Sequence, residues 1–226
     1  MRRNTSTWSW ERTLRHAKAW AGVAGISSVR DITAMDCLGV PVFVCERRSP
    51  AAHPYAFGRG GCALEAETGA YMEALESYVS EPGVAPLEMR HGRPCELAGV
   101  RAGCDPILEY APKLGHASDP GLNLLLVRAQ DLADDTEAWV PAELAFNPPP
   151  PGLGASIYGA SSNGLAAGNS LRQASLNALY ELLERDIWSI EFLRNHAAWL
   201  DDSQLPSGAR EIFQTAAKHD VRLVIR

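Results

Sequence analysis

Several features are missing from this 226-residue sequence, and each absence excludes a class of protein. No apolar run of about eighteen residues occurs, so no membrane span is expected. The formal net charge is -6 and no basic stripe offsets it, which argues against nonspecific nucleic-acid binding. The N-terminus, MRRNTSTWSWERTLRHAKAW, lacks the apolar core and cleavage site of a secretory signal. We therefore expect a protein of the cytoplasm.

The common sequence motifs of metal sites and nucleotide sites are also missing. The 5 cysteines and 6 histidines are scattered, with no C-x-x-C pair and no histidine spacing typical of a metal site. We expect buried or half-buried free thiols, without a disulfide framework or a zinc site. The sequence contains no P-loop, no protein-kinase signature and no G-x-S-x-G nucleophile elbow. Any nucleotide must therefore be held in another way.

Segments of helical and of strand character alternate along the chain, which predicts a mixed α/β fold. Helices are expected over residues 8–21, 65–79, 171–195 and 207–219. Strands are expected at residues 29–33, 40–46, 122–129, 138–140 and 221–225, with the first two paired as a hairpin. Residues 82–120 should be largely irregular, and residues 146–154, FNPPPPGLG, should form a stiff surface connector, because proline fixes φ and removes a donor. The end at Arg226, directly after an apolar run, predicts an α/β unit truncated at its C-terminus.

Two of the expected helices repeat one pattern of paired glutamates. AETGAYMEALE at residues 66–76 aligns with ASLNALYELLE at residues 174–184, which matches Glu73 with Glu181 and Glu76 with Glu184. Each helix follows a glycine-rich turn, GRGG in one case and NGLAAG in the other. Carboxylates three residues apart lie close together and repel each other unless something positive lies between them. The repetition therefore indicates a function for the charge.

At about 100° per residue, these glutamates form a polar stripe beside an apolar one. In the later helix the apolar stripe consists of Leu176, Leu179, Tyr180, Leu183, Ile187 and Ile190, and the polar stripe of Gln173, Asn177, Glu181 and Glu184. In the earlier helix Glu65, Gly69, Glu73 and Glu76 lie beside Met72, Leu75 and Val79. Four half-sheltered carboxylates suit Mg²⁺, which takes oxygen ligands and shares them with phosphates. The alternative is a set of solvated glutamates, with Arg185 as the i,i+4 partner of Glu181.

These residues resemble the YcaO domain family. The later half of its signature, S-N-G-L-A-x-G-N followed by A-x-x-x-A-L-x-E-x-x-E-R-D, is matched by Ser162, Asn163, Gly164, Leu165, Ala166, Gly168, Asn169, Ala174, Ala178, Leu179, Glu181, Glu184, Arg185 and Asp186. The segments VRDITAMDCLGVPVFVCERR and GRGGCALEAETGAYMEALE are similar to its earlier half. The resemblance implies a YcaO-like fold over residues 1–226, with anchors at 30–186, mixed sheets and long helices that carry the paired glutamates.

The resemblance implies ATP- and Mg²⁺-dependent chemistry on the backbone amides of a peptide or protein substrate. Such enzymes phosphorylate the oxygen of the amide, or of the hemiorthoamide that a cysteine, serine or threonine side chain forms with it. Loss of phosphate gives an azoline, the cyclodehydratase reaction, whereas external sulfide gives thioamidation; both serve ribosomal peptide modification (RiPP biosynthesis). The expected partners are a leader-peptide-binding protein or a TfuA-like protein, and a second copy of the chain in a homo-oligomer. The TfuA-like partner is expected because VCERRSP resembles family members that accompany TfuA proteins.

The resemblance also assigns roles to residues, although it names no catalytic one. The implied Mg²⁺ ligands are Glu73, Glu76, Glu181 and Glu184, and the implied nucleotide contacts are Arg30, Ser162, Asn169, Asn177 and Arg185. The chain departs from the family pattern at Gly69, Ser77 and Gln173, where serine, arginine and an acidic residue are usual. An amide in place of a carboxylate weakens Mg²⁺ binding. An alternative hypothesis is therefore a truncated YcaO relic that binds a peptide or partner without turnover.

Overall fold

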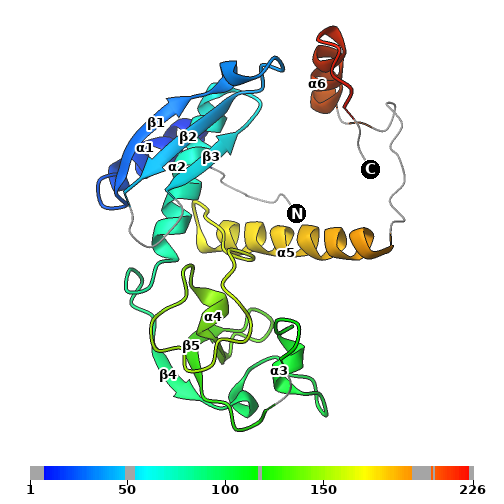
Figure 1. Ribbon diagram of the computed structural model, residues 1–226. Helices are drawn as coiled ribbons and strands as arrows, with labels where there is room; N and C mark the ends of the chain where they lie inside the picture. Colours follow the sequence, from blue (N-terminus) through cyan, green and yellow to red (C-terminus); the bar gives the residue numbers. More distant parts are fainter. Residues whose placement is uncertain (1–7, 49–53, 117–118, 195–204, 206, 224–226) are drawn as a thin grey trace, which may run out of the picture. The chain divides into compact units, whose positions relative to one another are not determined.

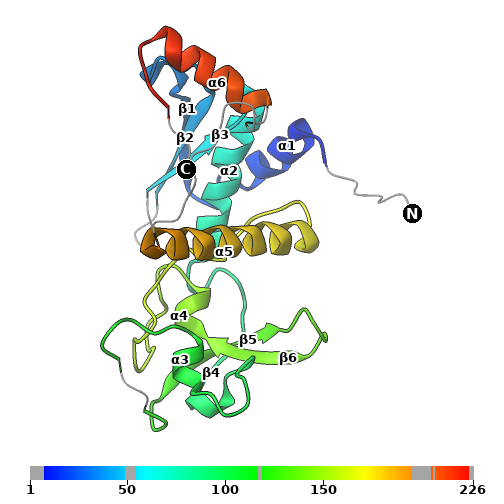
Figure 2. The ribbon, with the colours of Figure 1, turned by 90° about the vertical axis from the view of Figure 1, so that its right-hand side faces the viewer.

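A computed structural model describes residues 8–48, 54–116, 119–194, 205 and 207–223 (Figures 1 and 2). The chain divides into two compact units. The first unit combines Met1–Ser49, His53–Glu76 and Ala166–Arg226, and the second combines Pro50–Ala52 and Ser77–Leu165. Both units mix helices with a three-stranded sheet, as the α/β prediction requires. Within the described ranges, no helix is both long enough and apolar enough to cross a membrane.

The sheet of the first unit is antiparallel, in the order β1-β2-β3. Strand β1 (Ile26–Asp31) pairs with β2 (Val42–Arg47), so the predicted hairpin is confirmed. The 3₁₀ turn η1 (Thr33–Met35) lies between them. Strand β3 (Tyr55–Arg59) was not expected from the sequence, although YAFGR alternates exposed and buried residues as a half-buried strand does. The sheet places Cys45 of β2 opposite Ala56 of β3, and both are buried.

Helix α2 (Ala63–Val79) lies beside this sheet (Figure 1). It packs on the sheet through small side chains. Ala70 and Ala74 are fully buried in one cluster with Cys45 and Ala56. A Cβ on Gly58 would lie 2.0 Å from the Ala66 carbonyl oxygen, so only glycine allows this approach of helix and strand. The apolar stripe of Met72, Leu75 and Val79 is not among the buried residues of this helix. The close backbone contact favours small side chains on the helix, such as Ala70 and Ala74.

Three further helices belong to the first unit. Helix α1 (Trp10–Trp20) is capped by the Ser9 hydroxyl and buries Leu14 and Ala17. Helices α5 (Leu171–Arg194) and α6 (Ser207–Lys218) match the predicted ranges closely. None of the residues of α5 is buried, and the members of its apolar stripe are between 36% and 60% exposed. Of the strand expected at 221–225, residues 221–223 form no strand, and 224–226 lie outside the described residues.

The second unit has an antiparallel sheet in the order β4-β5-β6. Its strands are β4 (Met89–Gly92), β5 (Leu124–Gln130) and β6 (Glu137–Pro141), and its short helices are η2 (Pro94–Glu96), α3 (Pro106–Glu109) and α4 (Ala142–Ala145). The main core cluster consists of Leu97, Ile107, Leu124, Leu126, Ile157 and Tyr158. These elements confirm the strands expected near 122–129 and 138–140 and the irregular character of 82–120.

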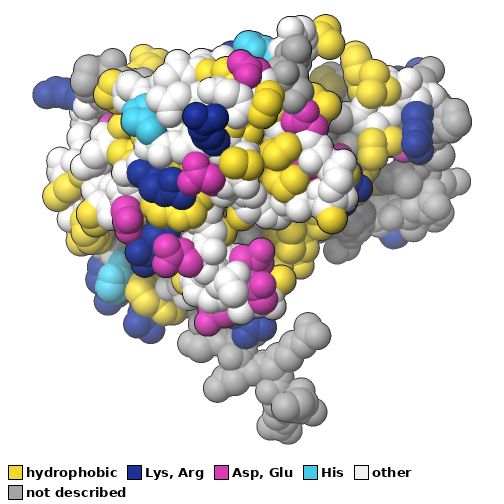
Figure 3. Space-filling model, turned by 90° about the horizontal axis from the view of Figure 1, so that it is seen from below, with side chains coloured by type: hydrophobic (Ala, Val, Ile, Leu, Met, Phe, Trp, Pro, Cys, Tyr) yellow, Lys and Arg dark blue, Asp and Glu magenta, His cyan; other side chains and the backbone are white. Residues whose placement is uncertain are grey.

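The connector expected at residues 146–154 is not wholly on the surface. Phe146 is 1% exposed and packs with Val127 and Ala142, because an aromatic ring at the end of α4 reaches the core. The thiol prediction also needs one correction. All five cysteines are free, but only Cys45 is buried and the other four are exposed. On the face drawn in Figure 3, acidic, basic and hydrophobic side chains are interspersed.

Candidate functional site

The loop that leads into α5 is held by polar side chains from two helices. The backbone N–H of Ala167 donates to Glu76 Oε2 of α2 at 2.8 Å. The carbonyl oxygen of Ala167 accepts from Asn177 Nδ2 of α5 at 3.0 Å. The N–H of Asn169 donates to Gln173 Oε1 at 2.9 Å. The two polar stripes expected from the sequence therefore meet at one loop.

Glycine is required in this loop for steric reasons. A Cβ on Gly168 would lie 2.5 Å from the backbone nitrogen of Ala174, inside the first turn of α5. Gly164 has φ +83°, a backbone conformation that residues other than glycine rarely adopt. The spacing G-x-x-x-G in SNGLAAGN is thus explained by a left-handed turn followed by close contact with the helix.

The carboxylates around this loop are under electrostatic strain. Burial, and to a smaller extent the negative charges of Glu181 and Glu73, raise the pKa of Glu76 to about 7 against the lowering effect of the Ala167 N–H. Burial and Glu181 also raise the pKa of Glu73, while the Phe57 N–H and Arg59 lower it. Much of Glu73 is exposed, so solvent screens its charge and Glu76 has the larger electrostatic penalty. Bound cations would relieve this repulsion.

The fourth glutamate and the arginine of α5 are placed differently. Arg185 pairs with Glu181 through Nη2 at 2.6 Å and Nε at 2.8 Å, the i,i+4 contact named as the alternative above. Glu184 is exposed, and the described residues show no interaction between it and the other three glutamates. Among the described residues, no group of three or more histidine, cysteine, aspartate or glutamate side chains is arranged to hold a metal ion. The carboxylate oxygens of these glutamates are nevertheless the kind of ligand that Mg²⁺ takes.

The residues implied as nucleotide contacts fall into three groups. Asn169 belongs to the loop, Asn177 donates to it, and Arg185 contacts Glu181. Arg30 is exposed on β1, and none of the contacts described for this part of the chain joins it to the glutamates. Ser162 belongs to the second unit, where it is exposed and its carbonyl oxygen accepts from the Leu165 N–H at 3.0 Å.

Backbone groups are the part of the site that sequence reasoning missed. Ala167 contributes an N–H and a carbonyl oxygen, and Phe57 of β3 contributes the N–H that reaches Glu73. Side-chain type carries no signal for either, because every residue except proline has both groups. Recognising β3 from the alternation in YAFGR would have pointed to the contribution of Phe57.

A family model described as YcaO cyclodehydratase, ATP- and Mg²⁺-binding, matches residues 57–225 of the chain. The chain belongs to the YcaO family. This membership confirms the family inferred from the signature residues, and the family description agrees with the expected cofactors, ATP and Mg²⁺. The match includes the loop at Ala167 and both glutamate-bearing helices.

Curated relatives extend the comparison. An uncharacterized protein of Methanothermobacter thermautotrophicus is 32% identical over 202 residues, which cover 85% of this chain and 50% of that protein. An uncharacterized protein in the tfuA 3′ region of Rhizobium leguminosarum bv. trifolii is 31% identical over 181 residues, which cover 76% of this chain and 40% of that protein. The chain therefore spans half or less of the length of these relatives.

The fold is similar to that of a solved YcaO structure. The YcaO of Methanopyrus kandleri, bound with AMPPCP and Mg²⁺, superposes with a TM-score of 0.66 at 24% identity. The alignment covers 92% of this chain and 52% of that one. The likeness confirms the expected YcaO-like fold, with its mixed sheets and helices.

Proposed function

We propose that this chain forms the ATP- and Mg²⁺-binding part of an enzyme that activates peptide backbone amides by O-phosphorylation. The observation that carries the proposal is the Ala167 loop, whose N–H donates to Glu76 of α2 and whose carbonyl oxygen accepts from Asn177 of α5, within the segment that matches the family. Carboxylates that repel each other in a half-buried place are suited to Mg²⁺ and the phosphates it binds. We treat residues 1–226 as belonging to one YcaO-like domain.

The chain's own residues would act by binding and orientation. Glu73, Glu76, Glu181 and Glu184 would hold Mg²⁺, and Arg30, Ser162, Asn169, Asn177 and Arg185 would contact the nucleotide. ATP supplies the phosphoryl group that converts the amide oxygen into a leaving group. The protein's contribution to such a transfer is mostly positioning and charge neutralisation. Arg185, already paired with Glu181, is oriented to offer its remaining guanidinium donors.

The substrate would be a ribosomally made peptide or protein, and the product an azoline or a thioamide. Thioamidation with a TfuA-like partner is supported by the Rhizobium relative, which is named for its place in the tfuA region. A leader-peptide-binding partner would serve the azoline reaction instead. We place the protein in the cytoplasm, where ATP is available, and propose a homo-oligomer because the apolar stripe of α5 is exposed.

A second candidate function is peptide or partner binding without turnover. Gln173 favours it, because a neutral amide stands where the family pattern has an acidic residue and its oxygen is engaged by the Asn169 N–H. A protein of this kind would retain nucleotide or peptide binding without ATP hydrolysis. An ATPase assay with candidate peptide substrates distinguishes the two functions.

The proposed site is tested by calorimetric titration of Mg²⁺-AMPPCP into the wild-type chain and into Glu181→Gln. Removal of one charged ligand should weaken binding at least about tenfold, because hard-cation affinity follows ligand charge. The control is Glu211→Gln, which makes the same chemical change at an exposed position of α6. Equal affinities for wild type and Glu181→Gln would remove Glu181 from the site.

A further inference from the structure

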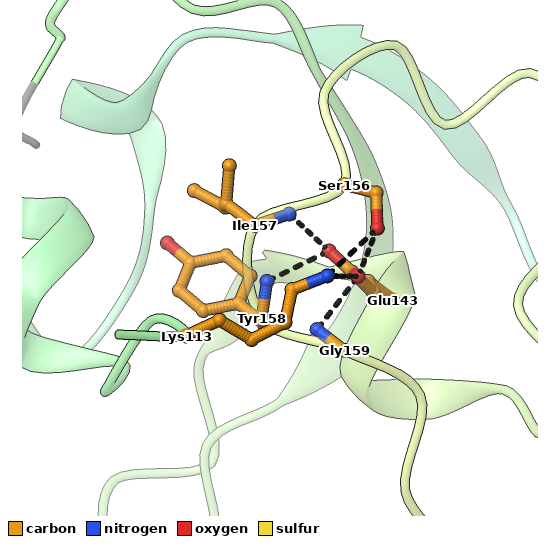
Figure 4. Close-up of polar contacts among 6 residues, drawn as sticks. All are labelled: Lys113, Glu143, Ser156, Ile157, Tyr158 and Gly159. Atoms are coloured by element: carbon orange, nitrogen blue, oxygen red, sulfur yellow. Dashed lines mark hydrogen bonds and ion pairs between the residues drawn. The ribbon is translucent and has the colours of Figure 1, made fainter. Parts of the chain in front are cut away.

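Glu143 of α4 is a buried carboxylate that the proposed chemistry does not use. It is 3% exposed, and four donors of a single loop satisfy it (Figure 4). The bonds to Oε1 come from the Ser156 hydroxyl at 2.6 Å and the Gly159 N–H at 2.7 Å, and those to Oε2 from the Ile157 N–H at 2.8 Å and the Tyr158 N–H at 3.0 Å. Three consecutive backbone amides and one hydroxyl therefore converge on one side chain.

This arrangement keeps Glu143 ionised in a place that would otherwise favour its neutral form. Burial raises the pKa of Glu143, but the hydrogen bonds from Ser156 and the three amides outweigh it and hold the pKa below the usual range. Lys113 Nζ lies 4.0 Å from Oε1 and adds a weaker attraction, since Lys113 is 47% exposed. Charge-assisted hydrogen bonds are stronger than neutral ones, so the loop backbone is firmly held.

The loop held by Glu143 leads directly into the family signature. Ile157 and Tyr158 pack in the core of the second unit, whereas Ser161, Ser162 and Asn163 are exposed. Gly159 is the last donor to Glu143, and Ser162 follows it three residues later. Since three residues span at most about 10 Å, an anchored Gly159 confines Ser162 to a small region.

We propose that Glu143 is a positioning residue, which fixes the backbone of 156–159 and so presents Ser162 to the nucleotide. The inference rests on the proposed function, because it takes Ser162 as a nucleotide contact. Without the carboxylate, the segment before Ser162 would have more conformations to lose on binding. The loss should appear as weaker nucleotide binding rather than only as a less stable fold.

The test compares Glu143→Gln with wild type in the full chain. Glutamine keeps one acceptor oxygen but directs an NH₂ group at donors, so part of the network must break. Amide hydrogen exchange of residues 160–165 should become faster, and the affinity for Mg²⁺-AMPPCP should fall about tenfold, as expected when an additional residue must be ordered on binding. The control is Glu96→Gln, because Glu96 also accepts a backbone N–H, from Arg93 at 2.6 Å, in the same unit.

A double-mutant cycle with Ser162→Ala separates positioning from a general loss of stability. If Glu143 acts through Ser162, the serine substitution should cost less affinity in the Glu143→Gln background than in wild type. Should Glu143→Gln fail to fold, Ser156→Ala removes a single donor and should change exchange and affinity in the same direction. Additive effects, unchanged affinity or unchanged exchange at residues 160–165 would overturn the inference. If the wild type binds no nucleotide, both the proposed function and the presentation of Ser162 are overturned. The exchange data would still show whether Glu143 restrains residues 160–165.

Discussion

Glu76→Gln should stabilise the metal-free protein at alkaline pH and leave its stability nearly unchanged at acidic pH. The reason is the raised pKa of Glu76, about 7 in the folded chain against an ordinary value of 4.5, caused mainly by burial and then by Glu181 and Glu73. An ionised carboxylate in this place is unfavourable until a cation binds. Glutamine has no charge to bury.

The sign of the pH dependence follows from the direction of the shift. Well below pH 4.5 the group is protonated in both the folded and the unfolded chain, so its ionisation has no effect on stability. As pH rises, the unfolded chain loses its proton first, and the free energy of unfolding falls until pH passes about 7. The full difference corresponds to about 3 kcal/mol. Because Glu76 is only half-buried, solvent screening should reduce the measurable effect to about 1–2 kcal/mol.

The geometry allows the substitution without loss of the backbone contact. Glu76 accepts the Ala167 N–H at 2.8 Å, and the glutamine oxygen can accept the same bond. The assay is urea denaturation at pH 5 and pH 8 with a chelator present, followed by the fluorescence of the chain's 6 tryptophans. Added Mg²⁺ should stabilise the wild type more than the variant.

The control for this prediction lies on the same helix. Glu65 also accepts a backbone N–H, from Gly61 at 2.8 Å, so Glu65→Gln makes the same change at a comparable contact. Between pH 5 and pH 8, Glu65→Gln should lose as much free energy of unfolding as the wild type does. If Glu76→Gln and wild type lose the same stability between pH 5 and pH 8, the carboxylate is not in an unfavourable environment, and the electrostatic basis of the candidate site fails.

Two predictions concern α5. Gln173→Glu should keep the hydrogen bond from the Asn169 N–H and add a negative charge. The affinity for Mg²⁺-AMPPCP, measured by calorimetry, should therefore rise about threefold to tenfold. An affinity equal to that of wild type would place residue 173 outside the site. The exposed apolar stripe of α5 should drive self-association, so the mass measured by light scattering should rise with protein concentration. Leu183→Glu should lower that mass. A wild type that stays monomeric would contradict this prediction.

The helices and the glutamate pairs were predictable from the sequence because they depend on local periodicity. The ranges of α2 and α5 follow from the spacing of apolar residues and from Pro82-Gly83, which cannot continue a helix. The same spacing places Gln173, Asn177 and Glu181 on one stripe, and the signature residues around it indicate the family. Each of these inferences uses residues within a few helical turns of one another.

The rest depended on contacts between residues far apart in the chain. The buried face of α2 is lined by alanines because Gly58 lets the helix backbone approach β3, a distance that the apolar pattern of the helix does not encode. Glu76 meets Ala167, and Glu143 meets the amides of 157–159, only after the chain has folded back on itself. The sequence alone therefore determined which side chains could form a charged site. Only the tertiary structure decided which backbone groups lie opposite these side chains, because every residue except proline has the same main-chain N–H donor.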